Sequence, residues 1–277
     1  MIIHHLEDLS ADWLTDALHA SGALPSSGAV ASFTTEPIGT GQMGDSYRVA
    51  LAYDGDADGA PASVVAKLAT EDETSRATGL ALRCYEVEVN IYAQLAPRLQ
   101  IRIPRCHHAE VDPATGWFTL LLEDMSPAVQ GDQLAGLTAE QIEEATVALA
   151  GLHGPCWEDP ELAALDWLNR GTDEANTFTA AMVAALFPGF VERYEDRLTC
   201  DELDLAAHLI DRLGPYLLER AGPRTVVHGD YRPDNLLFGG ADAPAPLTVV
   251  DWQTAIWGMP AADVAYAVAL GFADPAE

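Results

Sequence analysis

Residues 228–238 read HGDYRPDNLLF and carry the strongest indication of architecture and chemistry in the chain. Asp230 and Asn235 share one loop, and an apolar run follows directly. The spacing H-x-D-x-x-x-x-N places a candidate base and a candidate metal ligand on a single loop. A chance arrangement of loop acids is the alternative, and the order, the spacing and the flanking strand-like runs argue against it.

A second apolar run, residues 247–250, ends in Asp251-Trp252-Gln253, and Asp251 lies 16 positions after Asn235. An amide oxygen and a carboxylate that project from neighbouring strand ends can hold magnesium, which prefers oxygen ligands. We therefore expect Asn235 and Asp251 to bind the metal. Asp230 would then lie close enough to accept a hydroxyl proton as the catalytic base.

Three glycines, Gly39, Gly41 and Gly44, lie between strand-like runs at residues 31–38 and 46–53. In a dinucleotide-binding fingerprint a helix follows such glycines directly. Here a run with period-two alternation follows, which is the kinase arrangement, where the loop covers the nucleotide phosphates. An ordinary hairpin turn is the alternative reading of this feature alone.

The chain has 14 basic residues, and Lys67 is the single lysine among them. It follows Gly44 by 23 residues, at the end of the strand-like run 63–68, where it could contact nucleotide phosphates as a point charge. A helix is expected over residues 74–95, with Glu88 on its apolar face. Because a buried carboxylate without a cation is costly, we expect Glu88 to pair with Lys67. A surface lysine and a tolerated glutamate are the alternative.

The first part of the chain is rich in strand patterns and the second in helix patterns, with a boundary near residue 125. In the second part, Thr138 and Gln141 form a capping box at the start of a helix. Further helices are expected over residues 173–198, 201–220 and 261–270. We expect residues 1–125 to form a nucleotide-binding lobe and residues 126–277 a catalytic and acceptor-binding lobe.

The sequence resembles the aminoglycoside phosphotransferase family in its broad sense, including its choline kinase-like and ecdysteroid kinase-like branches. The resemblance runs from about Ile38 to Ala269. The motifs that carry it are the glycine loop, Lys67, YEVEVNIY at residues 85–92, LLEDM at residues 121–125, the loop that begins at His228, and Asp251.

This resemblance implies an α+β, bilobal protein-kinase-like fold, with a strand-rich N-terminal lobe and a mostly helical C-terminal lobe. It implies that adenine hydrogen-bonds to backbone groups near Glu123 and Met125, and that Asp263 braces the catalytic loop. Family members usually continue for several more helices after the Asp263 segment. The resemblance therefore implies that the chain is truncated at Glu277 or that its acceptor pocket is unusually open.

The composition gives 49% hydrophobic and 21% charged residues with a net charge of −29. This charge argues against binding to nucleic acid or to an anionic membrane. No apolar run is long enough for a membrane span, and the first residues lack a signal-peptide pattern, so a cytoplasmic location is expected. No two of the four cysteines form a C-x-x-C pair, so neither a zinc ribbon nor a redox motif is indicated.

We expect an ATP-dependent phosphotransferase that moves the γ-phosphoryl group of MgATP to a hydroxyl of a small molecule, with ATP and Mg²⁺ as cofactors. An aminoglycoside-like or choline-like cation and a neutral alcohol are all compatible with the sequence. The alternative is a non-catalytic nucleotide-binding pseudokinase module. A protein kinase is disfavoured because Trp252-Gln253 follows Asp251 where a D-F-G segment would be needed, and the chain has no A-P-E.

Overall fold

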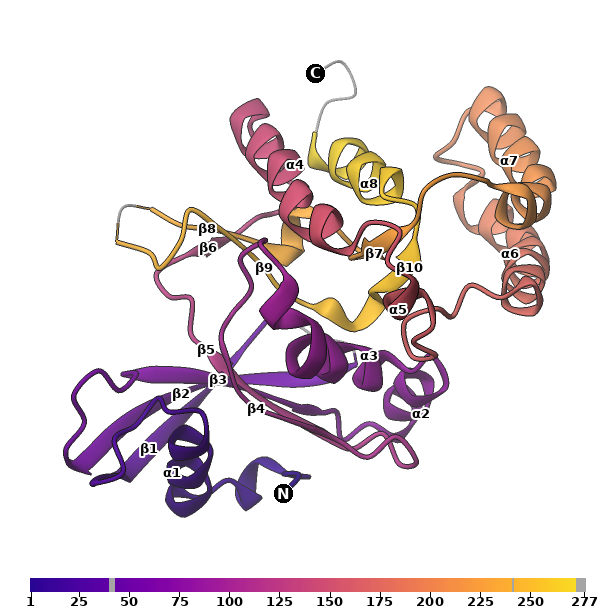
Figure 1. Ribbon diagram of the computed structural model, residues 1–277. Coiled ribbons are helices and arrows are strands. Elements are labelled where there is room, and N and C mark those ends of the chain that lie inside the picture. Colours follow the sequence, from indigo (N-terminus) through magenta and orange to yellow (C-terminus); the bar gives the residue numbers. More distant parts are fainter. Residues whose placement is uncertain (40–42, 241, 273–277) are drawn as a thin grey trace.

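The computed structural model describes residues 1–39, 43–240 and 242–272. The first part of the chain forms a five-stranded antiparallel sheet with the order β1-β2-β3-β5-β4 (Figure 1). Its strands are β1 (Gly28–Ile38), β2 (Gly44–Gly55), β3 (Ser63–Ala69), β4 (Cys106–Val111) and β5 (Phe118–Glu123). The strand-like runs read from the sequence therefore correspond to β1, β2 and β3, each extended by one to three residues at an end.

Both faces of this sheet are covered, which explains the continuous apolar run in β5. A short 3₁₀ turn, η1 (Leu6–Asp8), precedes helix α1 (Ala11–Ala20), and Ser10 caps α1 by accepting the Trp13 N–H at 3.2 Å. Leu121 of β5 belongs to the core under α1, whereas Phe118 and Leu120 belong to the main core on the other face. A strand buried on both sides reads as an unbroken hydrophobic stretch because neither of its faces meets water.

The single helix expected over residues 74–95 is wrong. The segment forms α2 (Glu73–Ala81), α3 (Cys84–Asn90), a π-helical turn η2 (Ile91–Leu95) and a 3₁₀ turn η3 (Ala96–Arg98). Arg83, between α2 and α3, adopts a left-handed conformation with φ 58° and ends the first helix.

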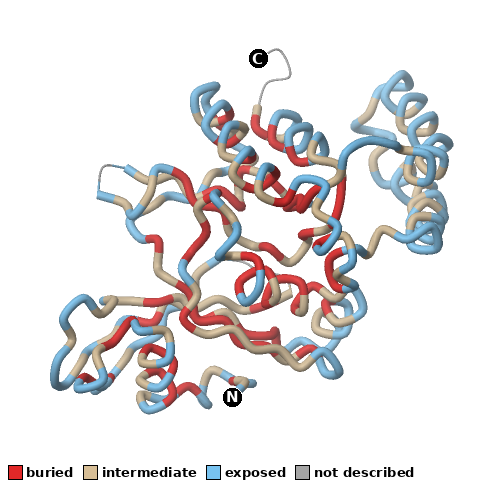
Figure 2. The backbone as a smooth tube through the Cα atoms, in the orientation of Figure 1, coloured by how far each residue is buried: buried red, intermediate tan, exposed pale blue. Residues whose placement is uncertain are grey.

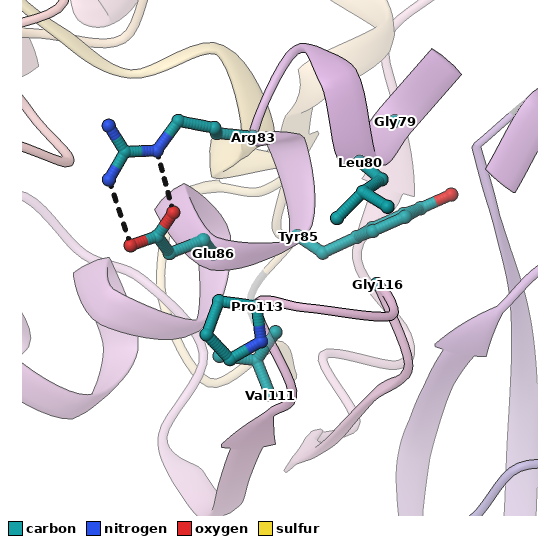
Figure 3. A pocket seen from close by; sticks show the side chains of 8 residues that line it. All are labelled: Gly79, Leu80, Arg83, Tyr85, Glu86, Val111, Pro113 and Gly116. Carbon is teal, nitrogen blue, oxygen red and sulfur yellow. Dashed lines mark hydrogen bonds and ion pairs between the residues drawn. The ribbon is translucent and has the colours of Figure 1, made fainter. Parts of the chain in front are cut away.

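Figure 3 shows this corner from close by, with Tyr85 lying beside Gly79 and Gly116 and with Arg83 bound to Glu86. A Cβ atom at Gly79 would lie 2.5 Å from the Tyr85 ring, so glycine is needed where α2 turns back. The Arg83 guanidinium donates to both oxygens of Glu86, at 2.7 and 3.0 Å. These contacts stabilise the break between α2 and α3. The spacing of apolar residues in the sequence does not indicate this break.

The second part of the chain is mostly helical and carries two small sheets with the orders β10-β7 and β6-β8-β9 (Figure 1). Its elements are β6 (Val129–Gln130), α4 (Ala139–His153), η4 (Gly154–Cys156), α5 (Pro160–Ala163), α6 (Asp173–Tyr194), α7 (Cys200–Glu219), β7 (Thr225–Val227), η5 (Pro233–Asn235), β8 (Leu236–Phe238), β9 (Leu247–Val249), η6 (Trp252–Thr254), β10 (Ile256–Gly258) and α8 (Ala261–Gly271). The capping box at Thr138 and Gln141 is present at the start of α4.

The main core crosses from the sheet into the helical part, since Val87 of α3, Leu120 of β5, Leu149 of α4 and Val249 of β9 belong to one buried cluster. Helices α6 and α7 pack against each other and form a hairpin at the side of the molecule, whose backbone is coloured exposed or intermediate throughout (Figure 2). Among the described residues, no helix combines the length and the apolar character needed to cross a membrane.

Candidate active site

Asp230 and Asn235 lie on the loop that joins β7 to β8. The Asn235 side-chain amide donates from Nδ2 to the Asp230 backbone carbonyl at 2.8 Å and to Asp230 Oδ2 at 3.0 Å. Its Oδ1 is thereby left for another partner. The Val250 N–H donates to the Asn235 carbonyl at 3.1 Å, so Asn235 lies next to the residue that precedes Asp251. The two expected metal ligands therefore come from neighbouring strands, as the sequence predicts.

Asp263, at the start of α8, fixes the backbone of this loop from beneath. Its side chain is 1% exposed and accepts the N–H groups of His228 and Gly229 at 2.8 and 2.9 Å. It also lies 3.0 Å from His153 Nε2. Gly229 has φ 80°, and a Cβ atom there would meet the Thr254 carbonyl at 2.6 Å, so only glycine fits this turn. The position of Asp230 is therefore set by backbone contacts on both sides.

His228 connects the ends of β7 and β9 through its ring. Nδ1 accepts the Asp230 N–H at 3.3 Å, and Nε2 lies 3.0 Å from the Val250 carbonyl. Burial lowers the pKa of His228, which outweighs the opposing effect of Asp263. The ring is therefore neutral, with its proton on Nε2. Through these two contacts the ring orients the loop.

Lys67, in β3, lies between two carboxylates that the sequence assigned to the site. Its Nζ is 2.8 Å from the Glu88 carboxylate and 2.8 Å from Asp251 Oδ1. The expected contact between Lys67 and Glu88 is present, and the contact with Asp251 was not foreseen. The three groups come from β3, α3 and the turn after β9, so they connect the sheet with the helical part.

The pKa values at this cluster follow from burial and charge together. Burial alone would lower the pKa of Lys67, but the two carboxylates outweigh it and raise the pKa above its ordinary value. Burial raises the pKa of Glu88, and Lys67 together with a hydrogen bond from the Trp252 backbone offsets this only in part. At Asp251, burial acts in the same direction, but Lys67 prevails and lowers the pKa. Asp251 is therefore ionised and ready to bind a cation.

Two of the three predicted glycines lie where the structure describes them. Gly39 directly follows β1 and has φ 73°, and Gly44 begins β2. A Cβ atom at Gly44 would lie 2.9 Å from the Leu68 carbonyl and 3.7 Å from Lys67 Cε, so this position passes directly beside the lysine. Gly41 lies outside the described residues. The glycine segment and Lys67 thus share one end of the sheet.

Glu123 is the last residue of β5, and Met125 lies on the segment that leads from the sheet into the helical part. The Glu123 side chain lies within 2.7 Å of Arg102 Nη2 through both oxygens, and it accepts the Arg105 N–H at 2.9 Å. The Glu123 carboxylate is therefore already engaged, and the Glu123 N–H also donates to the Arg105 carbonyl at 2.8 Å. Met125 is buried, and no partner is found for its N–H in the described part of the chain.

Sequence reasoning missed two residues that support the site. His153, at the end of α4, reaches Asp263 over 110 positions, and Arg170 joins two segments beside the Lys67 cluster. Neither belongs to a motif with a fixed spacing. His153 lies in the last turn of a capped helix and Arg170 in a connecting segment. In neither case does the surrounding sequence indicate which residue the side chain contacts.

A strand-rich part and a helical part, connected through a lysine that bridges two carboxylates, together form a bilobal protein-kinase-like α+β fold. Within this class, the chain belongs to the phosphotransferase enzyme family, whose family model matches residues 54–277. The fold and family expected from the sequence motifs are confirmed.

Solved structures of aminoglycoside phosphotransferases share the fold. A GDP complex of wild-type aminoglycoside 2'-phosphotransferase-IIIa is 15% identical with a TM-score of 0.54, covering 94% of this chain and 78% of that one. A streptomycin–ATP complex of APH(2")-IIa is 14% identical with a TM-score of 0.52, covering 92% and 74%. A curated relative, mouse acyl-CoA dehydrogenase family member 10, is 48% identical over 52 residues. The matched residues make up 19% of this chain and only 5% of the mouse protein.

Proposed function

We propose that this chain transfers the γ-phosphoryl group of MgATP to a hydroxyl group of a small molecule. The observation that carries the proposal is the convergence on Lys67, whose Nζ lies 2.8 Å from Glu88 and from Asp251. Asn235 lies beside Val250 and holds the Asp230 carboxylate in the same region. These contacts support the proposal, because phosphoryl transfer needs a phosphate-binding cation, metal ligands and a base close together, and these residues would supply them.

The nucleotide would bind between Gly44, at the start of β2, and the start of the helical part. Lys67, oriented by Glu88, would contact the α- and β-phosphates, with Gly44 directly beside it. The unpartnered Met125 N–H would donate to adenine, with backbone near Glu123 as its counterpart. The ATP and GDP in the similar structures support a purine nucleotide. Residues 1–125 would then act as the nucleotide-binding lobe, and a protein that uses ATP would be expected in the cytoplasm.

The oxygen atoms near Lys67 fit Mg²⁺. Asn235 Oδ1 is left free by the contacts of Nδ2, and Asp251 Oδ2 receives only a 3.2 Å contact from Gln253 Nε2. An amide oxygen and an ionised carboxylate are ligands that magnesium prefers. When bound, the ion neutralises charge that develops on the phosphates.

The protein's own part in the reaction is orientation and proton transfer. Asp230 would accept the hydroxyl proton of the acceptor as that oxygen attacks the γ-phosphorus in line with the leaving oxygen. Asn235 holds the Asp230 carboxylate in place through Oδ2. Arg232 Nε lies 3.3 Å from the same oxygen and gives that carboxylate a second contact. Most of the acceleration would come from positioning and fixed charge.

The acceptor would be a small hydroxylated molecule. The net charge of −29 favours a cation through electrostatic steering, and streptomycin and kanamycin in the similar structures are cations of this kind. A choline-like molecule or a neutral alcohol would present the same hydroxyl to Asp230. A panel of acceptors therefore belongs in the test.

The test compares Asp230→Asn with Asp234→Asn, a carboxylate of the same loop that binds Gln133 and Arg232 instead. ATP consumption is measured with magnesium across streptomycin, kanamycin, choline and neutral alcohols, and ADP binding is measured by calorimetry. We expect Asp230→Asn to lower turnover by about 10²- to 10⁴-fold while ADP binding stays intact, and Asp234→Asn to keep most of its turnover. Undiminished turnover in Asp230→Asn would refute the base. A wild-type chain that binds ADP but consumes no ATP with any acceptor would support the pseudokinase alternative.

A further inference from the structure

Arg170 lies in the segment between α5 and α6 and contacts two distant parts of the chain. Its Nη1 donates to the Leu82 carbonyl and its Nη2 to the Ala255 carbonyl, both at 2.8 Å. The segment itself is anchored, because the fully buried Leu168 accepts the Trp257 N–H at 3.0 Å. Arg170 is therefore a fixed point that joins the N-terminal part to the turn after β9.

Each carbonyl that Arg170 contacts lies beside an element that carries a site residue. Leu82 ends α2, directly before the corner that begins α3, and α3 carries Glu88. Ala255 ends η6, which begins immediately after Asp251. Glu88 and Asp251 both contact Lys67 at 2.8 Å. Arg170 thus links the α2–α3 corner to η6 through backbone carbonyls. Lys67 links α3 to the Asp251 turn through the side chains of Glu88 and Asp251.

The placement of a guanidinium here is costly, which argues that it has a role beyond filling space. Burial lowers the pKa of Arg170, and its Nε is buried with no hydrogen-bond partner in the described residues. The planar fork presents a separate nitrogen to each carbonyl, Nη1 to Leu82 and Nη2 to Ala255, whereas an ammonium would have to reach both carbonyls from one nitrogen. The Leu82 carbonyl also belongs to the C-terminal end of α2, where the helix dipole attracts a cation.

The same connecting segment holds the α2–α3 corner a second time. Asp166 Oδ2 lies 2.7 Å from Arg83 Nη2, and Arg83 is the residue whose left-handed conformation separates the two helices. Arg83 in turn binds Glu86 of α3 through both carboxylate oxygens (Figure 3). The segment of residues 164–172 therefore determines where α3 begins.

We propose that Arg170 is a positioning residue that sets the distance between Glu88 and Asp251, and thereby the geometry in which Lys67 and the metal ligand meet the nucleotide. This inference rests on the proposed function, because it assumes that the Lys67 cluster binds a magnesium–nucleotide complex. Arg170 acts through the backbone of α3 and of the Asp251 turn, and it touches no reacting atom. Its loss should loosen the cluster without removing any of its groups.

The experiment measures ADP affinity by calorimetry with and without magnesium, for the full chain. Arg170→Met is expected to weaken magnesium-dependent ADP binding by about 10- to 100-fold, as the loss of a residue that orients metal ligands does. Arg98→Met is the matched control, because Arg98 of η3 forms an ion pair with Asp159 and likewise joins the two parts of the chain. Arg98→Met is expected to change the melting temperature but not the ADP affinity.

A double-mutant cycle separates positioning from general stability. In a Glu88→Gln background, Arg170→Met is expected to cause no further loss, since the geometry it protects is already gone. An equal loss in both backgrounds would overturn the inference, as would tight binding by Arg170→Met alone. If that variant unfolds, Arg170→Lys, which keeps the cation but lacks the planar fork, is expected to show a smaller loss with the same dependence on Glu88. A wild-type chain that binds no ADP would refute the proposed function and this inference together.

Discussion

Replacing Lys67 with methionine removes the cation that Glu88 and Asp251 share, while it keeps an unbranched apolar stem of similar length. The Glu88 side chain is 2% exposed, so water cannot take over the role of the ammonium. Two carboxylates would then face each other in a buried site. We expect Glu88 to take up a proton, because a neutral acid is cheaper there than an unpaired charge.

The magnitude follows from the proton uptake. Glutamate has an ordinary pKa of 4.5, so keeping it protonated at pH 7 costs about 3.4 kcal/mol, at about 1.36 kcal/mol per pH unit. The penalty exists only above the pKa of the unfolded chain, where unfolding releases the proton, and it vanishes as the pH falls below that value. The wild-type chain already carries part of it, because burial raises its Glu88 pKa. The variant should therefore lose up to about 3 kcal/mol at pH 7 and much less at pH 5.

Urea-induced unfolding at pH 5, 6 and 7 tests this reasoning. The double variant Lys67→Met/Glu88→Gln should regain most of the lost free energy of unfolding at pH 7, because glutamine carries no charge to bury. A loss for Lys67→Met that is as large at pH 5 as at pH 7 would refute the argument. So would a double variant that is no more stable than the single one.

Three further outcomes follow from contacts around the site. Asp263→Asn should cost about 3 kcal/mol, because its amide nitrogen meets backbone donors, and it should lower turnover more than ADP affinity; equal stability in urea would contradict this. Gly79→Ala should cost about 1–3 kcal/mol through its clash with the Tyr85 ring, whereas Gly240→Ala, with nothing within 4 Å, should leave the melting temperature unchanged. In an NMR titration the His228 ring should stay neutral below its ordinary pKa of 6.5. The free energy of unfolding should therefore fall as the pH drops below 6.5, because the unfolded chain takes up a proton that the buried ring does not. Protonation of the ring at or above pH 6.5 would show the neutral assignment to be wrong.

The sequence was most informative where chemistry imposes a fixed spacing. The loop from Asp230 to Asn235 and the strand end at Asp251 were placed correctly, because short strands on either side leave little freedom in where these side chains lie. Lys67 and Glu88 were paired from one argument, that a carboxylate on an apolar helix face needs a cation, and the structure has them in contact.

The supporting contacts could not be read in the same way. Arg170 binds carbonyl groups 88 and 85 positions away, and a backbone carbonyl is present at every residue, so it leaves no mark in the sequence. The break at Arg83 was missed for a related reason. The apolar face of the expected helix continues through it, and only the packing of Tyr85 on Gly79 shows why the chain turns there.

The solitary lysine has a practical consequence for labelling. Apart from the amino terminus, Lys67 is the one primary amine in the chain, so acylating reagents have a single internal target. An acyl-phosphate derivative of a nucleotide that binds at this site would transfer its acyl group to Lys67. The mass of the one peptide that contains Lys67 would then show whether the nucleotide had bound. The reagent must first draw the amine away from its two carboxylates and strip its proton, so the speed of acylation becomes a direct gauge of how tightly the ammonium is held.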